Sequence, residues 1–385
     1  MSPANAPEPK NPPSTMRNHT ITRRTIIGAL AAGPARAASF PWLSPDLPDA
    51  TRAEARLVQP AEKRPMIQIS TDPLALETPI QSLRAASTPN DQFFVHYAQG
   101  TPPDRGLLDL WVLNVEGDGA ERSLRLSWND LNEFPQTEIL AVCESTGNRR
   151  GLMKPHVEGL QWGHGAIGCA TWHGPRLRDI LARAGLKPDS REIRFHGAGD
   201  PGYTKRLPID KATASETMIA TSMNGGPLPF LNGTPVRLVV PGWSGAYWVK
   251  HLTRIAPMLS QSIAPPMAQT EPAVASLIVS PVQGETVERS GFTLRGIAWD
   301  RGKGILRVDI SLDAGNTWQS AFLDRELSPY AFRTFKMETG PLPRGPTELR
   351  VRATSNAREK QPEIWRPNPD GFFNNVPQRL LVEVA

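Results

Sequence analysis

The residues best suited to chemistry lie in one short stretch that begins at Cys143 and continues as Glu-Ser-Thr-Gly-Asn-Arg149-Arg150. The apolar run at 137–142 has the length of a β-strand, so the thiol is expected at a strand end beside a glycine-asparagine turn. Nearby cations lower the pKa of a thiol toward the thiolate, which attacks or binds metals. The planar, permanently charged guanidinium group of arginine matches oxyanions. The pattern indicates a metal or anion site, although a structural core cysteine beside two solvated arginines fits equally well.

The same stretch resembles the active-site segment of the sulfite oxidase family of molybdenum enzymes. The resemblance rests on the cysteine motif, on Gly-Leu-Gln-Trp162 and on the spacing of glycine, tryptophan and leucine at 165–181. In that family a cysteine sulfur is the one protein ligand to molybdenum, beside the dithiolene of a molybdopterin. The resemblance therefore implies that Cys143 binds the metal. It also implies that Arg149 and Arg150 hold the substrate and that Trp162 walls its pocket.

Two positions depart from the family pattern. Three residues separate Cys143 from Gly-Asn, where the family usually has one. The segment Thr-Pro-Asn-Asp-Gln-Phe-Phe94-Val95 looks like the family's entry strand, which usually continues as Arg-Asn-His, but here it continues as His96-Tyr97-Ala98. Where the family has the permanent positive charge of an arginine, this site has His96, which is positive only when it is protonated. Histidine titrates near neutral pH. A structural role at the strand end suits His96 equally well.

A glycine-rich loop and a glycine-rich turn complete the implied site. Tyr203 follows Gly-Asp-Pro-Gly, and the resemblance places its hydroxyl at the metal; an ordinary loop aromatic is the alternative. The resemblance assigns the molybdopterin to Cys143, Phe94, Val95, Asn232, Arg237, Trp248, Val249 and Lys250. It assigns the substrate to His96, Arg149, Arg150, Trp162, Tyr203 and Arg379.

The first 37 residues predict export. Arg23 and Arg24 precede a short apolar run and an Ala-x-Ala site that ends at Ala37, as in a twin-arginine signal. The run is too short to span a bilayer, and a chance arginine pair before an alanine-rich helix is the alternative. Because this pathway carries folded proteins, cofactor loading in the cytoplasm and residence in the periplasm are expected. An irregular arm is expected at 38–65.

Charge and cysteine content exclude several classes. Beyond residue 37 the chain carries 38 basic and 37 acidic side chains. This near-balance does not indicate a protein that binds nucleic acid or a membrane surface through its charge. Two cysteines provide no disulfide framework, no Cys-x-x-Cys zinc site and no c-type haem attachment. The cofactor implied by the resemblance is molybdenum-molybdopterin, with no haem in this chain.

The implied fold class is α+β with two domains. The resemblance implies a mixed α/β molybdopterin-binding catalytic domain of sulfite oxidase type at 66–260 and an immunoglobulin-like dimerisation domain at 277–385. A linker is expected at 261–276 from its composition. Short alternating stretches separated by turns also predict a β-sandwich after the linker. Further expected elements are helices at 127–134 and 175–184 and strands at 193–196 and 235–240.

Other functions are favoured less by the residues. Gly242-Trp-Ser244-Gly nearly matches a serine hydrolase elbow, yet only His251 follows it. His156, His164 and His173 lack the spacing of a zinc hydrolase helix. A non-catalytic periplasmic binding protein with a buried Cys143 stays open, and molybdenum content would separate it from an enzyme.

The expected function is oxidation of sulfite to sulfate at molybdenum, with electrons passed to a separate periplasmic cytochrome c. The expected assembly is a homodimer or a heterodimer with a cytochrome subunit. Because Arg-Asn-His is missing, the alternative is a related enzyme, of sulfur dehydrogenase or sulfoxide reductase type, acting on another sulfur compound.

Overall fold

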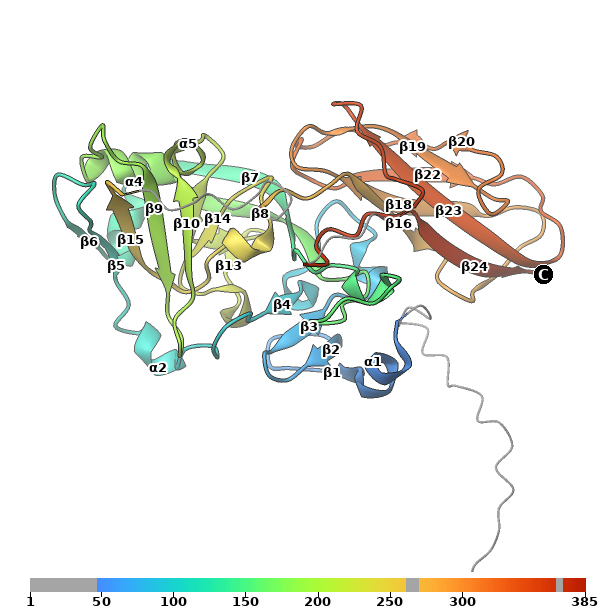
Figure 1. Cartoon of the computed structure of the whole chain (residues 1–385), viewed down its shortest axis with the longest axis horizontal. Helices are drawn as coiled ribbons and strands as arrows, with labels where there is room; N and C mark the ends of the chain where they lie inside the picture. The colour runs from blue at the N-terminus through green and yellow to red at the C-terminus, as the bar shows by residue number, and fades with distance from the viewer. Residues whose placement is uncertain (1–46, 261–269, 365–369) are drawn as a thin grey trace, which may run out of the picture. The chain divides into compact units, whose positions relative to one another are not determined.

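The computed structural model describes residues 47–260, 270–364 and 370–385 (Figure 1). The predicted export signal at 1–37 lies outside the described residues, as do 38–46 of the expected arm and 261–269 of the expected linker.

The first described residues form a small antiparallel sheet of order β1-β2-β3-β4. Its elements are α1 (Asp49–Glu54), β1 (Arg56–Val58), β2 (Met66–Ser70), β3 (Ala75–Glu77), the 3-10 helices Ile80–Leu83 and Asn90–Gln92, and β4 (Val95–His96). The expectation of an irregular arm at 38–65 is wrong for 49–58. There β1 pairs with β2, and Leu47, Ala55 and Ile67 bury a common apolar cluster.

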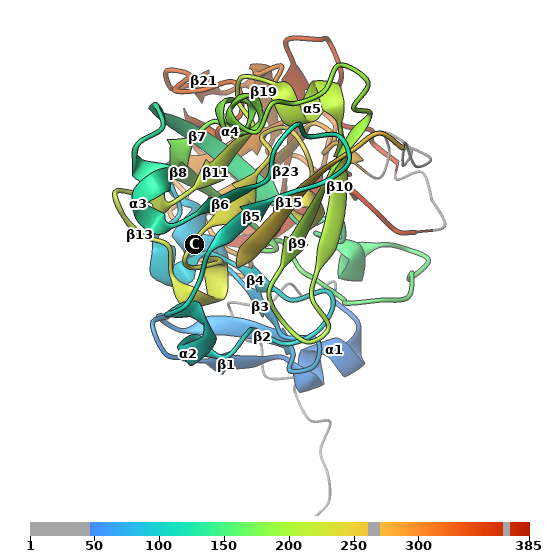
Figure 2. The ribbon, with the colours of Figure 1, turned by 90° about the vertical axis from the view of Figure 1, so that its left-hand side faces the viewer.

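Two larger sheets and a two-stranded ladder build the part of the chain between residues 113 and 258. One sheet has the order β10-β9-β15-β5-β6, the other β13-β12-β8-β7, and β11 pairs with β14. The strands are β5 (Leu113–Val115), β6 (Leu124–Leu126), β7 (Gln136–Glu144), β8 (Ile167–Pro175), β9 (Glu192–Gly197), β10 (Thr204–Pro208), β11 (Met218–Ala220), β12 (Ser222–Met223), β13 (Gly226–Pro227), β14 (Arg237–Val239) and β15 (Leu252–Met258). Figure 2 shows β9, β10 and β15 side by side. The predicted strands at 193–196 and 235–240 correspond to β9 and β14.

The helices of this domain are short. They are α2 (Arg105–Leu108), α3 (Trp128–Asn132), α4 (Leu177–Arg183), α5 (Ile209–Thr213) and the 3-10 helices Arg150–Leu152, Phe230–Asn232 and η5 (Gly245–Tyr247). Helices α3 and α4 confirm the predictions at 127–134 and 175–184 with narrower bounds. Ser127 caps α3 through a capping box with Asp130, and α4 begins later because β8 continues to Pro175.

The C-terminal residues form two facing sheets, as predicted for a sandwich. Their orders are β16-β18-β22-β21 and β17-β24-β23-β19-β20. The strands are β16 (Ala275–Ser280), β17 (Thr286–Val287), β18 (Thr293–Trp299), β19 (Ile305–Ser311), β20 (Gln319–Ser320), β21 (Phe322–Leu323), β22 (Arg333–Glu338), β23 (Gly345–Ser355) and β24 (Gln378–Val384). Strand β16 begins inside the expected linker because Ala275 and Leu277 are buried and pair with β18. In the described parts of the chain, no helix has the length and apolar character needed to cross a membrane.

Candidate active site

The strand pair β7–β8 places Cys143 in the main hydrophobic core. Cys143 is the penultimate residue of β7, is 2% exposed and lies opposite Gly168 of β8. A side chain at Gly168 would collide with the ring of Phe93, since a Cβ there would lie 2.5 Å from it. The strand-end position predicted for the thiol is therefore confirmed, and glycine opposite the cysteine leaves room for an aromatic wall.

The turn after the thiol is closed by its own polar groups. The Asn148 side chain donates to Glu144 Oε1 (2.9 Å) and accepts from the Ala166 backbone N–H (3.1 Å). Arg149 adopts a left-handed backbone (φ 64°), a conformation that costs a non-glycine residue some free energy. The longer turn is thus tied to the start of β8 through Asn148.

A second glycine lies directly beside the sulfur. Gly245 begins η5, whose entry is capped by Ser244 accepting from the Ala246 N–H (3.1 Å). A Cβ built on Gly245 would lie 2.8 Å from Cys143 Sγ. Only a residue without a side chain lets this turn approach the thiol so closely.

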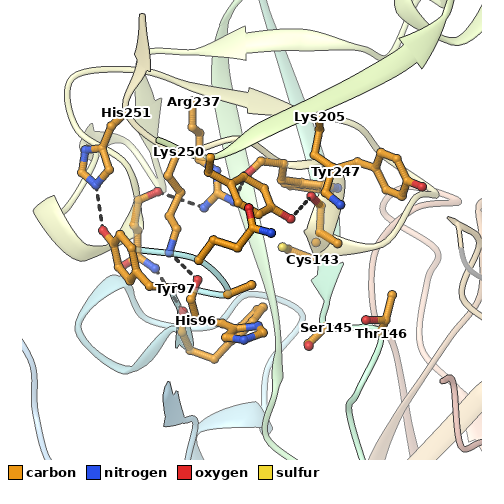
Figure 3. A pocket seen from close by; sticks show the side chains of 18 of the residues that line it. His96, Tyr97, Cys143, Ser145, Thr146, Lys205, Arg237, Tyr247, Lys250 and His251 are labelled. Carbon is orange, nitrogen blue, oxygen red and sulfur yellow. Dashed lines mark hydrogen bonds between the residues drawn. The ribbon is translucent and has the colours of Figure 1, made fainter. Parts of the chain in front are cut away.

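Cys143 opens into a cavity of about 310 Å³ (Figure 3). Three cationic side chains line it, Lys205, Arg237 and Lys250, together with the imidazoles of His96 and His251. No carboxylate occurs among the described lining residues. In a partly desolvated cavity this arrangement favours an anion.

Arg237 and Lys250 form the innermost positive charge. Arg237 donates to the carbonyls of Asn232 (2.9 Å) and Trp248 (3.1 Å), while its Nε is buried with no partner. Lys250 Nζ donates to the His96 carbonyl (2.7 Å) and lies 3.5 Å from the centre of the Tyr97 ring. Burial lowers the pKa of both side chains, which is the response of a cation held away from water without a full negative partner.

Burial also controls the thiol. It raises the pKa of Cys143 to about 11, against the opposing effect of Arg237 and Lys250. The sequence pattern suggested that the neighbouring Arg149 and Arg150 would favour the thiolate. That interpretation is corrected, because the cations that act on the sulfur come from β14 and from the segment after η5.

His96 lies in the cavity wall as a neutral ring. Burial, with Lys250 and Arg150 nearby, lowers its pKa to about 4, so it carries no charge at neutral pH. Its ring lies 5.4 Å from that of Trp162, which is fully buried behind it and is not among the lining residues. Trp162 therefore supports the wall through His96.

The three arginines expected to hold the substrate lie elsewhere. Arg149 is buried 3.6 Å from Glu144 and 5.3 Å from the centre of the Trp299 ring. Arg150 donates to the carbonyls of Asp370 and Gly371, each at 3.3 Å. Arg379 is exposed on β24, opposite Arg350. None of the three lines the cavity in the described structure. Glu144 engages Arg149, C-terminal carbonyls engage Arg150, and Arg379 belongs to β24.

The remaining predicted residues divide between the cavity and its support. Those in the lining are Phe94, Tyr203, Asn232 and Trp248, with Cys143, His96, Arg237 and Lys250 described above. Val95 and Val249 are buried behind the wall. The Tyr203 hydroxyl, expected at the metal, donates to the Ala246 carbonyl at 2.8 Å.

Sequence reasoning missed several lining residues, chiefly Lys205, Tyr97, Tyr247, His251 and Phe372. Lys205 had a usable signal, because strand alternation puts it on the same side as Tyr203. Phe372 had no such signal, because it belongs to a segment that is distant from Cys143 in the sequence. There the Phe373 N–H donates to the Thr146 carbonyl (2.8 Å) and Asn374 Nδ2 to the Arg149 carbonyl (3.0 Å).

The donor set fits a cofactor that brings its own metal ligands. Across the described residues, no group of three or more histidine, cysteine or acidic side chains could hold a metal ion. One soft thiol is present instead, with a glycine turn against it and an unpartnered guanidinium nitrogen on Arg237. Thiolate selects soft metals, and the cations suit a negatively charged organic ligand. These features match molybdopterin.

Comparisons with known proteins agree with this chemistry. Residues 99–263 match the oxidoreductase molybdopterin binding domain, and residues 267–385 match the Mo-co oxidoreductase dimerisation domain. Chicken sulfite oxidase is 32% identical over 372 residues, covering 84% of this chain and 79% of that protein. Human mitochondrial sulfite oxidase is 36% identical over 340 residues, covering 77% of this chain and 62% of that protein. The chain thus spans less than two thirds of the human protein's length.

A solved structure extends the match to the fold. The sulfane dehydrogenase SoxCD from Paracoccus pantotrophus aligns with a TM-score of 0.73 and 25% identity, covering 92% of this chain and 94% of that one. The family models, the sulfite oxidase relatives and this fold place the chain in the sulfite oxidase family of molybdopterin-binding oxidoreductases.

Proposed function

We propose that the protein oxidises sulfite to sulfate at a molybdenum centre bound by Cys143. The observation that carries the proposal is the cavity wall, in which a buried thiol faces Lys205, Arg237 and Lys250 and no carboxylate occurs among the described lining residues. An oxyanion gains from such a wall because no acidic group competes for the cations. The relatives named sulfite oxidase support this substrate.

The cofactor and the protein have separate tasks. The molybdenum cofactor, when bound, would supply oxygen-atom transfer and a store for two electrons at its metal, which side chains cannot provide. Cys143 would be its protein ligand, as a thiolate, because a bound metal deprotonates a thiol. Arg237 and Lys250 would hold the negative charge of the pterin. The remaining wall would orient the anion, with Tyr203 and Tyr247 limiting access by water.

A second substrate class is favoured by His96. Because its pKa is lowered to about 4, this part of the wall is neutral at pH 7, and it suits a less charged sulfur compound than a wall with a permanent cation. The structurally similar protein named a sulfane dehydrogenase supports this candidate. A partner protein that presents the reduced sulfur atom belongs to the same candidate.

We further propose export to the periplasm by the twin-arginine route and transfer of single electrons to an external cytochrome c. The support for export is the Arg23-Arg24 motif followed by Ala-x-Ala. The support for an external acceptor is that the chain's two cysteines are both buried and provide no c-type haem attachment. The match to a dimerisation domain supports a homodimer or a heterodimer with a cytochrome subunit.

The test is turnover by the full-length protein matured with its export system intact. Reduction of cytochrome c is measured with sulfite and thiosulfate, oxidation of a reduced dye is measured with a sulfoxide, and molybdenum and pterin are counted per chain. Turnover of sulfite with one molybdenum per chain is the expected result. Turnover of thiosulfate alone would favour the second candidate. Protein without molybdenum and pterin would refute both.

A further inference from the structure

Lys205 is placed at the cavity by the alternation of β10. It follows Tyr203 by two residues, and both side chains line the cavity, whereas Thr204 and Arg206 are exposed. Its ammonium lies 5.4 Å from the centre of the Tyr203 ring and 5.6 Å from that of Tyr247. Two aromatic rings therefore flank the cation at the wall, and Figure 3 shows Lys205 beside one of them, Tyr247.

The other cations of the site are engaged by protein groups. Arg237 binds two backbone carbonyls, and Lys250 binds the His96 carbonyl. Lys63 lies behind the wall, with its ammonium donating to Asn232 Oδ1 (2.6 Å) and to two carbonyls. Across the described residues, the Lys205 ammonium has no hydrogen bond and no carboxylate within ion-pair distance. Its three donors are open to a ligand in the cavity.

We propose that Lys205 is the residue that binds the anionic substrate and sets the preference for an oxyanion, an inference that rests on the proposed function. Arg237 and Lys250 lie against the thiol and suit the cofactor, and His96 is neutral. Among the three cationic side chains that line the cavity, Lys205 is then the one left for a small anion. The flanking tyrosine rings restrict its motion, which lowers the entropy lost when the anion binds.

The charge of Lys205 has a pH signature. Burial, and then Arg206, lowers its pKa from the ordinary lysine value. The groups that face it are Tyr203 and Tyr247, whose own pKa values are raised by burial, so both stay neutral. Because its pKa is lowered, the ammonium loses its proton at a lower pH than an ordinary lysine, and the neutral amine no longer holds the anion. KM for sulfite should therefore begin to rise at a pH below the ordinary lysine pKa. Arginine at this position stays charged and should remove that rise.

The test compares Lys205→Gln and Lys205→Arg with the wild type. A matched control is Lys187→Gln, which removes the same charge from an ammonium that donates to the Asp118 carbonyl at an exposed site. Steady-state kinetics with sulfite give kcat and KM, and titration calorimetry with sulfate on molybdenum-loaded protein gives the anion affinity without turnover. Loss of a charged hydrogen bond predicts that Lys205→Gln raises KM and the sulfate Kd by about 10- to 100-fold with a smaller change in kcat. Lys205→Arg should recover most of both.

The results separate this inference from the proposed function. Unchanged KM and sulfate affinity in Lys205→Gln would overturn it, as would a loss confined to kcat. The wild type could bind sulfate without oxidising sulfite, while the Lys205→Gln variant no longer binds sulfate. In that case the proposed reaction is wrong and the anion site stands. Equal losses in Lys187→Gln and Lys205→Gln would also overturn it, because a general field effect would then explain both.

Discussion

Replacing Gly245 with alanine tests whether the turn at η5 sets the position of the thiol. The added Cβ would lie 2.8 Å from Cys143 Sγ and 3.2 Å from the Glu144 carbonyl oxygen. Neither neighbour is a flexible side-chain end. Cys143 lies within the β7–β8 ladder and is 2% exposed, so the sulfur or the turn must move.

The expected cost in stability is small, whereas the expected effect on the site is large. Overpacking of this kind costs about 1 to 3 kcal/mol. Gly245 does not have a positive φ, so alanine also reduces the entropy of the unfolded chain, which returns about 0.4 to 1 kcal/mol. The free energy of unfolding should therefore fall by at most about 2.6 kcal/mol. A reacting group displaced by about 1 Å can lose about 100-fold in rate.

The assay combines urea unfolding, molybdenum content per chain and kcat with sulfite. Gly340→Ala is the matched control, because Gly340 has no atom within 4 Å of its would-be Cβ and no positive φ. We expect Gly245→Ala to lose metal or kcat far beyond its loss of stability, and Gly340→Ala to retain both. Wild-type metal content and kcat in Gly245→Ala would show that the thiol does not depend on this glycine and would refute the reasoning.

Three further changes probe other parts of the site. Cys143→Ser should abolish turnover while leaving far-UV circular dichroism unchanged, because the metal would lose its one protein ligand; full activity would contradict the assignment of Cys143 as that ligand. Glu77 accepts from the Gly163 and Gly165 N–H groups, each at 2.8 Å, and burial raises its pKa to about 7. Because the folded pKa lies above the unfolded value, this group's contribution to stability should be lost as pH rises from about 4.5 to about 7. Urea unfolding across that pH range should show a smaller loss of unfolding free energy in Glu77→Gln than in the wild type. An equal dependence on pH in the two proteins would show that Glu77 does not cause the loss. Tyr203→Phe should lower kcat more than it raises KM, and a change in KM alone would make the hydroxyl a binding group only.

The sequence by itself determined the family of the protein and the strand-end position of Cys143, the proposed metal ligand. Cys143, its turn and Gly-Leu-Gln-Trp162 form a local motif, and local motifs are legible because their spacing is preserved in the chain. The sandwich after the linker was predictable for a similar reason, since its strands alternate along their own length. Strand alternation past Tyr203 would also have pointed to Lys205.

Tertiary structure decided which charges meet the thiol. Arg149 and Arg150 are close to Cys143 in sequence, yet Glu144, Asp370 and Gly371 engage them. The cations at the cavity come instead from strands and turns that follow Cys143 by many residues, and only packing brings them together. Protonation was also hidden from the sequence, because desolvation depends on what surrounds a group: burial keeps His96 neutral and raises the pKa of the thiol.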